Sequence, residues 1–350
     1  MKRVIATLAV IMTTVLSTEA QEVKNIIYLI GDGMGLTSAS MMQLENNYET
    51  TIFDEADNVA LQKTYSLDNR VTDSAASGTA LATGFKTNNT MLGQLPDGTH
   101  PESLMELAAD KGKATGIVVT TYLQHATPGA FYAHVPSRHE YAKISEQLLA
   151  SDIDIAIGGG MAFFEERYGS DKKARQAIAE SGFTLLNNLD TNIGGERILA
   201  LLADKEIENR TGYLAKATTA AINHLSDNEN GFVLMVEGSL IDGMGHGNNA
   251  EGQQAEMRDF MEAIEVAVAY ANEHPETLVV VTADHETGGL AIISGNADFN
   301  LSEQGVEYKW ATGGHSGVMV PIYLYGTGAE LINGVMENAD LGLRLKELIQ

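Results

Sequence analysis

An apolar run enters a glycine-rich turn at Asn25-Ile26-Ile27-Tyr28-Leu29-Ile30-Gly31-Asp32-Gly33-Met34-Gly35. Such a run is typical of a buried strand, and the glycines leave room for a ligand at its carboxyl end. A dinucleotide site would need a third glycine where Leu36 stands, and Asp32 would repel a pyrophosphate. We therefore interpret Asp32 as a ligand of a divalent metal ion.

The rest of the chain alternates short apolar runs with helical patterns, which indicates a parallel sheet covered on both faces. Strands are expected at residues 23–30, 59–66, 114–120, 153–157, 231–236, 277–282, 290–293 and 318–324. Helices are expected at residues 74–83, 101–111, 138–150, 172–181, 194–203, 212–226, 251–272 and 341–349. These elements predict an α/β fold, a three-layer sandwich whose large, mostly parallel central sheet is flanked by helices. The candidate site residues are spread from end to end, which favours a single domain over residues 21–350.

The composition excludes several classes of function. The chain has 350 residues, with 22 Lys and Arg against 47 Asp and Glu, and a net charge of −25. This charge argues against nucleic acid or an anionic membrane as the partner, because both need a basic face. The absence of cysteine excludes disulfides, thiol nucleophiles and thiolate metal sites.

The N-terminus has the pattern of a cleaved secretory signal. Lys2 and Arg3 precede an apolar run at residues 4–16, and small residues lie before Gln21. We expect residues 1–20 to be a signal peptide and the mature protein to be periplasmic or secreted. No later segment approaches the roughly 18 uninterrupted apolar residues of a membrane span, so no membrane anchor is expected.

A second motif, VTDSAASGTA at residues 71–80, combines small residues with Asp and Ser at a predicted helix start. Backbone N–H groups and the helix dipole favour an anion there. Ser74 is either a reactive side chain or only a helix cap, and the motif alone does not distinguish the two.

Three further motifs place ligand-type side chains at predicted strand ends. VEGSLIDGMGH at residues 236–246 holds Glu237, and sets Asp242 and His246 one helical turn apart, a spacing that suits a zinc site. VVVTADHETGG at residues 279–289 supplies Asp284 and His285, and ATGGHSG at residues 311–317 supplies His315. With Asp32 and Ser74, these oxygen and nitrogen ligands suffice for two borderline metal ions and one hard ion. Two zinc ions about 4 Å apart are a standard clamp for phosphoryl transfer.

Taken together, the motifs resemble those of the alkaline phosphatase family over nearly all of the mature chain. The resemblance rests on D-G-M-G, T-D-S-A-A-S-G-T-A, H-A-T-P, V-E-G-S-x-I-D-x-x-x-H, T-A-D-H and G-G-H-S-G, all in family order. It implies a hydrolase of small phosphate monoesters that works at alkaline pH through a phosphoserine. It also implies a homodimer. The stretch at residues 296–308 is too short for the large crown insertion of some members, so residues 21–350 are expected to be the catalytic domain alone.

The resemblance also implies a role for each site residue. Ser74 would be the nucleophile, activated by a zinc ion, and Arg138 would bind two phosphate oxygens. One zinc ion would be held by Asp32, Asp284 and His285, and the other by Asp242, His246 and His315. A magnesium ion would be held by Asp32, Thr127 and Glu237.

Two residues depart from the best-known bacterial members. His125 stands where they carry an Asp near the magnesium, and imidazole suits zinc better, so the third ion would be magnesium or zinc. Gly243 replaces a larger residue that approaches the phosphate, which suggests looser phosphate binding and faster product release.

Two alternative functions and one physical property stay open. The chain could be a phosphodiesterase of the same superfamily, although Glu237 and Thr127 favour a monoesterase. It could also be a secreted metal- or phosphate-binding protein without turnover, which would not need Ser74. With 35 Gly, 6 Pro and no cysteine, the composition suggests a heat-labile, cold-adapted protein.

Overall fold

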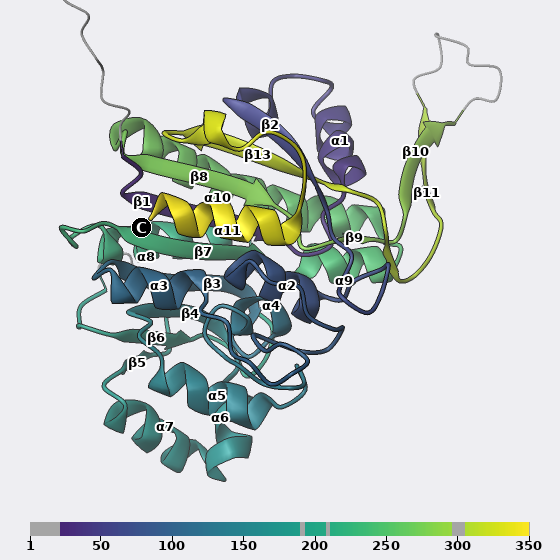
Figure 1. Cartoon of the computed structure of the whole chain (residues 1–350). Coiled ribbons are helices and arrows are strands. Elements are labelled where there is room, and N and C mark those ends of the chain that lie inside the picture. Colours follow the sequence, from purple (N-terminus) through teal and green to yellow (C-terminus); the bar gives the residue numbers. More distant parts are fainter. Residues whose placement is uncertain (1–21, 190–192, 208–210, 296–304, 350) are drawn as a thin grey trace, which may run out of the picture.

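A ten-stranded sheet forms the centre of the computed structural model, which describes residues 22–189, 193–207, 211–295 and 305–349 (Figure 1). The expected signal peptide lies outside the described residues. The strand order is β14-β2-β13-β8-β1-β7-β3-β4-β6-β5, and β13 runs antiparallel to both of its neighbours while the other pairs are parallel. The strands of this sheet are β1 (Asn25–Gly31), β2 (Asn58–Lys63), β3 (Ala114–Tyr122), β4 (Ile155–Gly159), β5 (Thr184–Leu186), β6 (Ile198–Leu201), β7 (Phe232–Gly238), β8 (Thr277–Thr282), β13 (Val320–Gly326) and β14 (Gly334–Glu337).

Strand β1 lies near the middle of the sheet and shows why it needs helices on both faces. Tyr28 and Ile30 belong to one core cluster, whereas Ile27 and Leu29 belong to the other. Successive side chains of a strand point to opposite faces, so an uninterrupted apolar run is stable only when both faces are covered.

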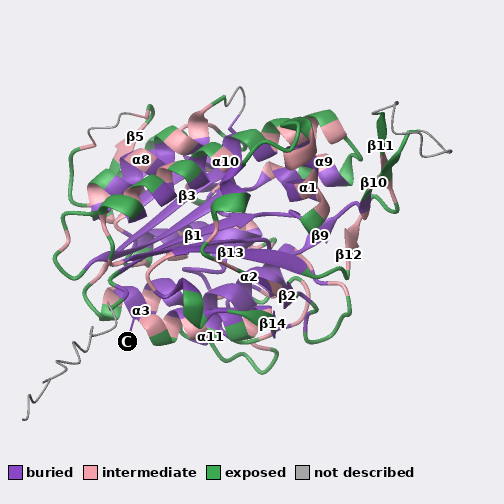
Figure 2. Ribbon diagram, turned by 90° about the horizontal axis from the view of Figure 1, so that it is seen from above, coloured by how far each residue is buried: buried purple, intermediate pink, exposed green. Residues whose placement is uncertain are grey.

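Helices cover the two faces of the sheet, as Figure 2 shows from above. One face carries α1 (Leu36–Glu45), α8 (Tyr213–Leu225), α9 (Leu240–His246) and α10 (Ala250–Glu273). The opposite face carries α2 (Ser74–Thr83), α3 (Leu104–Asp110), α4 (Ala126–Gly129), α5 (Tyr141–Ala150), α6 (Met161–Tyr168), α7 (Asp171–Glu180) and α11 (Asn338–Leu348). Two short 3-10 helices complete the set, η1 (Ile52–Glu55) and η2 (Ala329–Leu331). The predicted three-layer α/β sandwich is confirmed.

One predicted element is wrong, and another lies outside the main sheet. The helix expected at residues 194–203 is instead strand β6, whose four residues are all buried between β4 and β5. An apolar run that is buried on both faces carries no periodicity that separates a strand from a helix. The strand expected at residues 290–293 is β10 (Leu290–Ser294), which pairs with β11 (Val306–Trp310) in a hairpin that projects from the body (Figure 1).

A second small sheet matters for the site. It pairs β9 (Glu286–Thr287) with β12 (His315–Ser316) in antiparallel register. No helix among the described residues has the length and apolar character required to cross a membrane.

Candidate active site and metal centre

Four neighbouring strands bring the predicted ligands to one edge of the sheet. Strands β8, β1, β7 and β3 are adjacent and parallel, and Ile30 of β1 is in register with Thr282 on one side and Glu237 on the other. Their carboxyl ends therefore lie together, and the buried carboxylates of Asp32, Glu237 and Asp284 meet there. This is the edge at which open α/β sheets bind ligands.

His315 reaches the same edge from a different direction. It precedes β13, and since β13 runs antiparallel to β8, the start of β13 lies at the carboxyl end of β8. Strand β12 then pairs with β9, which follows His285. The rings of His285 and His315 consequently stack, with centroids 3.6 Å apart and planes 20° from parallel.

Helix α9 supplies two more ligand candidates on one face. Asp242 and His246 are one turn apart, and His246 Nε2 lies 3.3 Å from Asp242 Oδ2. His246 Nε2 also lies 3.2 Å from His315 Nε2. The predicted set of Asp242, His246 and His315 is therefore brought together.

Ser74 is the first residue of α2, directly after the N-cap residue Asp73. Its Oγ lies 3.2 Å from His285 Nε2, and its side chain is buried. The helix is rich in small residues, which permits close packing on α4, where an added Cβ at Gly78 would lie 3.3 Å from Thr127 Cα. This close packing places Ser74 and Thr127 beside the carboxylates.

Arg138 faces the site through a contact that the sequence did not reveal. Arg138 Nη1 donates to Asp73 Oδ2 over 3.2 Å, and Nη2 lies 3.3 Å from His125 Nε2. Asp73 Oδ1 accepts from the backbone N–H of Ala76 at the start of α2. One carboxylate thus caps the helix of Ser74 and holds the guanidinium.

Candidate ligand atoms gather in three groups among the described residues, and the atoms of each group lie within 4.8 Å of one another. The first group is Asp32, Asp284 and His285, which is one of the predicted zinc sets. The second is Asp242, His285 and His315, with His246 beside it, and the third is Asp32, His125 and Glu237. His125 therefore offers a candidate ligand atom to the third group.

The hydrogen bonding of the buried polar atoms in these groups indicates whether metal ions fit the site. Within the described parts of the chain, several buried atoms have no hydrogen-bond partner: both carboxylate oxygens of Asp32, Asp284 Oδ2, Glu237 Oε1, Thr127 Oγ1 and His125 Nδ1. A buried polar atom without a partner is costly, and metal coordination removes that cost. The donor set of carboxylate, imidazole and hydroxyl suits zinc and magnesium, so the residues fit these ions.

The pKa values of the three fully buried carboxylates, Asp32, Glu237 and Asp284, also favour the binding of cations. Burial and the charge of Asp284 raise the pKa of Asp32 well above its usual value. Burial and the charge of Asp242 raise the pKa of Asp284 to about 7, and burial raises the pKa of Glu237 to about 8. These shifts favour protonation when nothing neutralises the cluster, and a bound cation would reverse them.

Two of the imidazoles, those of His125 and His285, are in the form that coordinates a metal ion. Burial, then the charge of His315, lowers the pKa of His285 well below its usual value. Burial, then the charge of Arg138, lowers the pKa of His125 to about 3. Both rings are therefore neutral at ordinary pH, which is the form that coordinates a metal. By contrast, the hydrogen bond to Asp242 raises the pKa of the half-exposed His246 to about 9.

Strand β9, which directly follows Asp284 and His285, holds two residues of the site that were not predicted from the sequence. Glu286 accepts from the Leu290 backbone N–H and from Ser316 Oγ, which ties β9 to β12. Thr287 Oγ1 contacts both Asp242 and His285. Their position directly after T-A-D-H was a signal, but the sequence did not show what they touch.

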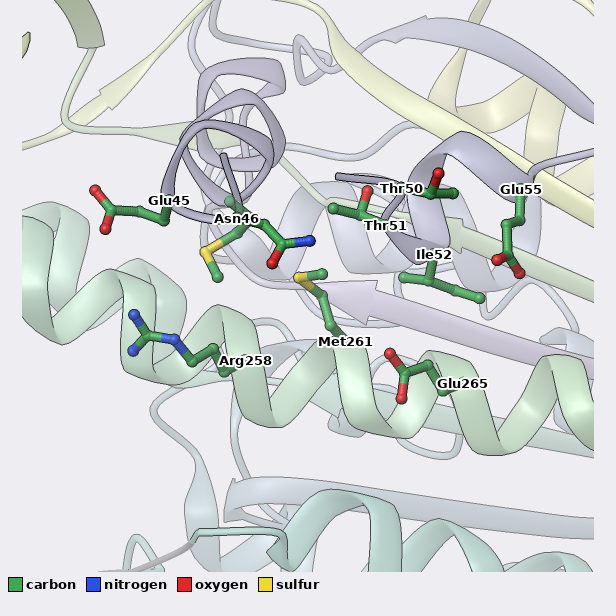
Figure 3. A pocket seen from close by; sticks show the side chains of 10 residues that line it. Glu45, Asn46, Thr50, Thr51, Ile52, Glu55, Arg258, Met261 and Glu265 are labelled. Atoms are coloured by element: carbon green, nitrogen blue, oxygen red, sulfur yellow. The ribbon is translucent and has the colours of Figure 1, made fainter. Parts of the chain in front are cut away.

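The groove drawn in Figure 3 is a different feature. It has a volume of about 420 Å³ and lies between α1 and α10, where Glu45, Glu265 and Arg258 are among its lining residues. None of the predicted site residues is among those that line it.

Comparisons with known proteins agree with this geometry. Residues 23–305 match the family model described as alkaline phosphatase. Alkaline phosphatase 3 of Bacillus subtilis is 32% identical over 94% of this chain and 89% of its own length. The structure of the alkaline phosphatase of the Antarctic bacterium TAB5 is 35% identical, with a TM-score of 0.88 over 95% of this chain and 99% of that one. A cold-active alkaline phosphatase from a psychrophilic Shewanella is 31% identical, with a TM-score of 0.85 over 93% and 100% of the two chains.

Proposed function

The chain belongs to the alkaline phosphatase family, and we propose that it hydrolyses phosphate monoesters at alkaline pH through a phosphoserine on Ser74. One observation carries the proposal. Ser74 Oγ lies at a helix N-terminus, 3.2 Å from a nitrogen of the Asp32, Asp284 and His285 group. A serine hydroxyl is a weak nucleophile, and metal coordination is one recognised way to activate it.

We propose that two zinc ions and one magnesium ion belong to the site. One zinc ion would be held by Asp32, Asp284 and His285, and the other by Asp242, His246 and His315. The magnesium ion would be held by Asp32, Thr127 and Glu237. When bound, these ions supply positive charge that lowers the pKa of nearby hydroxyls and stabilises charge on the transferring phosphoryl group.

The side chains and backbone of the chain carry the remaining steps. Ser74 Oγ gives up its proton to solvent and forms a bond to phosphorus, while the bond from phosphorus to the substrate oxygen breaks and that oxygen takes up a proton from solvent to leave as the alcohol. Arg138 and the N–H groups at the start of α2 bind the non-bridging oxygens. Water then cleaves the phosphoserine, which releases inorganic phosphate and returns a proton to Ser74. Positioning and charge provide most of the rate in such transfers.

The third site takes magnesium or zinc, and His125 is the residue that decides between them. A histidine-to-aspartate mutant of the TAB5 enzyme carries magnesium in its M3 site. The third group of this chain has a histidine beside two carboxylates. Imidazole favours zinc and carboxylate favours magnesium, so we propose that the third site of this chain binds both ions competitively.

Three further properties are proposed. The mature protein is periplasmic or secreted, forms a homodimer, and is cold-adapted. The high glycine and low proline content supports the last property, as do the similar structures from an Antarctic bacterium and a psychrophile. A thermal midpoint below about 65 °C would agree with cold adaptation, and a much higher value would exclude it.

One experiment tests the function. The mature protein is purified, its metal content is measured, and it is assayed with an aryl phosphate monoester and diester at alkaline pH, before and after chelation. We expect bound zinc, preference for the monoester, loss of activity on chelation, and recovery with zinc and magnesium. Preference for the diester would indicate a phosphodiesterase, and bound metal without turnover would indicate a binding protein.

A further inference from the structure

We propose that Thr287 is a positioning residue whose single hydroxyl joins the two zinc groups. Thr287 is buried, and its Oγ1 lies 2.5 Å from Asp242 Oδ1 and 3.2 Å from His285 Nδ1. Asp242 is in one proposed zinc set and His285 is in the other. The inference rests on the proposed function only in assuming that zinc ions bind at these two groups.

The donor and acceptor groups available determine the direction of the hydrogen bonds that Thr287 makes with Asp242 and with His285. A threonine hydroxyl has one hydrogen, and an ionised carboxylate can only accept. Thr287 therefore donates to Asp242 Oδ1, and its oxygen is left to accept a hydrogen from His285 Nδ1. The hydroxyl can make both hydrogen bonds at once, because it donates in one and accepts in the other. It therefore links Asp242 and His285 in one chain of hydrogen bonds.

The second contact sets the tautomer of His285. With its hydrogen on Nδ1, the ring keeps a free lone pair on Nε2. That nitrogen faces the first zinc group, at 3.4 Å from Asp32 Oδ1 and 3.2 Å from Asp284 Oδ2. Thr287 thereby aims the coordinating atom of His285, as the outer partners of ligating histidines do.

The backbone around Thr287 keeps the hydroxyl in place. Thr287 N donates to Gly33 O over 3.2 Å, and its residue pairs in register with His315. Its methyl side packs on α9, where an added Cβ at Gly245 would lie 3.0 Å from Thr287 Cγ2. The segments that carry the proposed ligands of both zinc ions therefore pack together around the side chain of Thr287.

The test removes the hydroxyl and measures zinc affinity apart from activity. Thr287→Val keeps the shape of the side chain, Thr287→Ser keeps the hydroxyl, and Thr287→Ala provides a second hydroxyl-free variant if valine prevents folding. Thr218→Val is a matched control, because Thr218 is buried in α8 and its hydroxyl has no hydrogen-bond partner among the described residues. Zinc binding is followed by competition with a chromophoric chelator, together with kcat and KM of the reloaded enzyme.

We expect Thr287→Val and Thr287→Ala to weaken both zinc-binding steps by roughly 10–100-fold, as loss of an outer partner does. Thr287→Ser should restore both steps, and Thr218→Val should leave them unchanged. Wild-type affinity in the valine variant, or weakening of a single step, would overturn the proposal. If zinc affinity falls as expected but the wild type has no phosphatase activity, the proposed function fails while the role of Thr287 stands.

Discussion

Arg138 Nη1 lies 3.2 Å from Asp73 Oδ2, and Asp73 is also the residue that caps the helix of Ser74. The same carboxylate oxygen accepts from the backbone N–H of Thr90. The residue proposed to bind phosphate and the helix that carries the proposed nucleophile are therefore held by one side chain. A substitution at Asp73 should therefore affect both the position of Arg138 and the start of the helix that carries Ser74.

The first prediction concerns this pair. Arg138→Lys loses the two-pronged guanidinium, and lysine offers only a point charge. A charge-assisted hydrogen bond contributes about 1.5–3 kcal/mol, so kcat/KM should fall roughly 10–100-fold and inhibition by phosphate should weaken. Asp73→Asn loses the ion pair with Arg138 but should cost less than Arg138→Lys, because Asn caps a helix as well as Asp does and the guanidinium itself is kept. Unchanged phosphate inhibition in Arg138→Lys would show that Arg138 does not bind phosphate.

The second prediction concerns Gly243, which is exposed on α9 between Asp242 and His246. An added Cβ there would meet nothing within 4 Å, so a larger side chain fits without strain. In Gly243→Lys the added charge should strengthen phosphate binding by about 1 kcal/mol, which is roughly fivefold, and slow product release. Steady-state kinetics with phosphate as inhibitor measure this, and Gly243→Ala serves as the size control. If the lysine and alanine variants behave alike, Gly243 does not set phosphate affinity.

The third prediction concerns the ion at the third site. His125→Asp replaces an imidazole with a carboxylate beside Asp32 and Glu237, which favours a hard ion. After dialysis against equal zinc and magnesium, the variant should hold more magnesium per chain and less zinc than the wild type. Elemental analysis measures both, and Glu237→Gln should lower the occupancy of either ion. An unchanged ratio of the two metals in His125→Asp would contradict the assignment.

The fourth prediction concerns His134, whose Nε2 lies 2.8 Å from Glu106 Oε1 and whose Nδ1 faces the carbonyl oxygen of Gly93. Two acceptors suit the protonated ring. Burial alone would lower the pKa of His134, but the hydrogen bond to Glu106 contributes to a net rise in this pKa. A raised histidine pKa stabilises the fold fully below the unfolded value of about 6.5, and this stabilisation is lost as pH rises through the folded value.

The pKa of Glu106 is shifted in the opposite direction from that of His134. Its pKa is lowered because its bonds to His134 and Ser103 outweigh burial, so its contribution is lost at acid pH. Urea unfolding should therefore show a wild-type advantage over Glu106→Gln that is largest between about pH 4.5 and 6.5 and falls above that range. The advantage should be about 1 kcal/mol or less. Glu102→Gln controls for charge removal near α3. Parallel pH curves for wild type and Glu106→Gln would refute the coupling.

Much of the fold was predictable because its signals are local. The buried strand at residues 277–282 and the helix at residues 74–83 have the predicted bounds, since an apolar run and a cap residue mark them. The strand β6 was not predictable in this way, because its type depends on the strands beside it. Helices α1 and α6 were not expected either.

The candidate site likewise has features that could be predicted from the sequence and features that could not. The gathering of carboxylates and imidazoles at the strand ends was predictable, because their residue types and their place after apolar runs point to one shared edge of the sheet. The contacts of Asp73 with Arg138 and of Thr287 with Asp242 were not, since they join residues 65 and 45 positions apart in the chain. Such contacts depend on the packing of whole elements, as does the position of His125 beside Asp32 and Glu237 in the third group of candidate ligand atoms.

The central claim is that Ser74 carries the phosphoryl group, and trapping that group tests it most directly. The enzyme is mixed with an aryl phosphate, quenched in acid and digested, and the peptide that contains Ser74 is analysed by mass spectrometry. We predict one phosphoryl group on Ser74 in the wild type and in Ser77→Ala, but none in Ser74→Ala, whose kcat should fall more than about a thousandfold. Undiminished turnover in Ser74→Ala, or a phosphoryl group on a different residue, would contradict the claim.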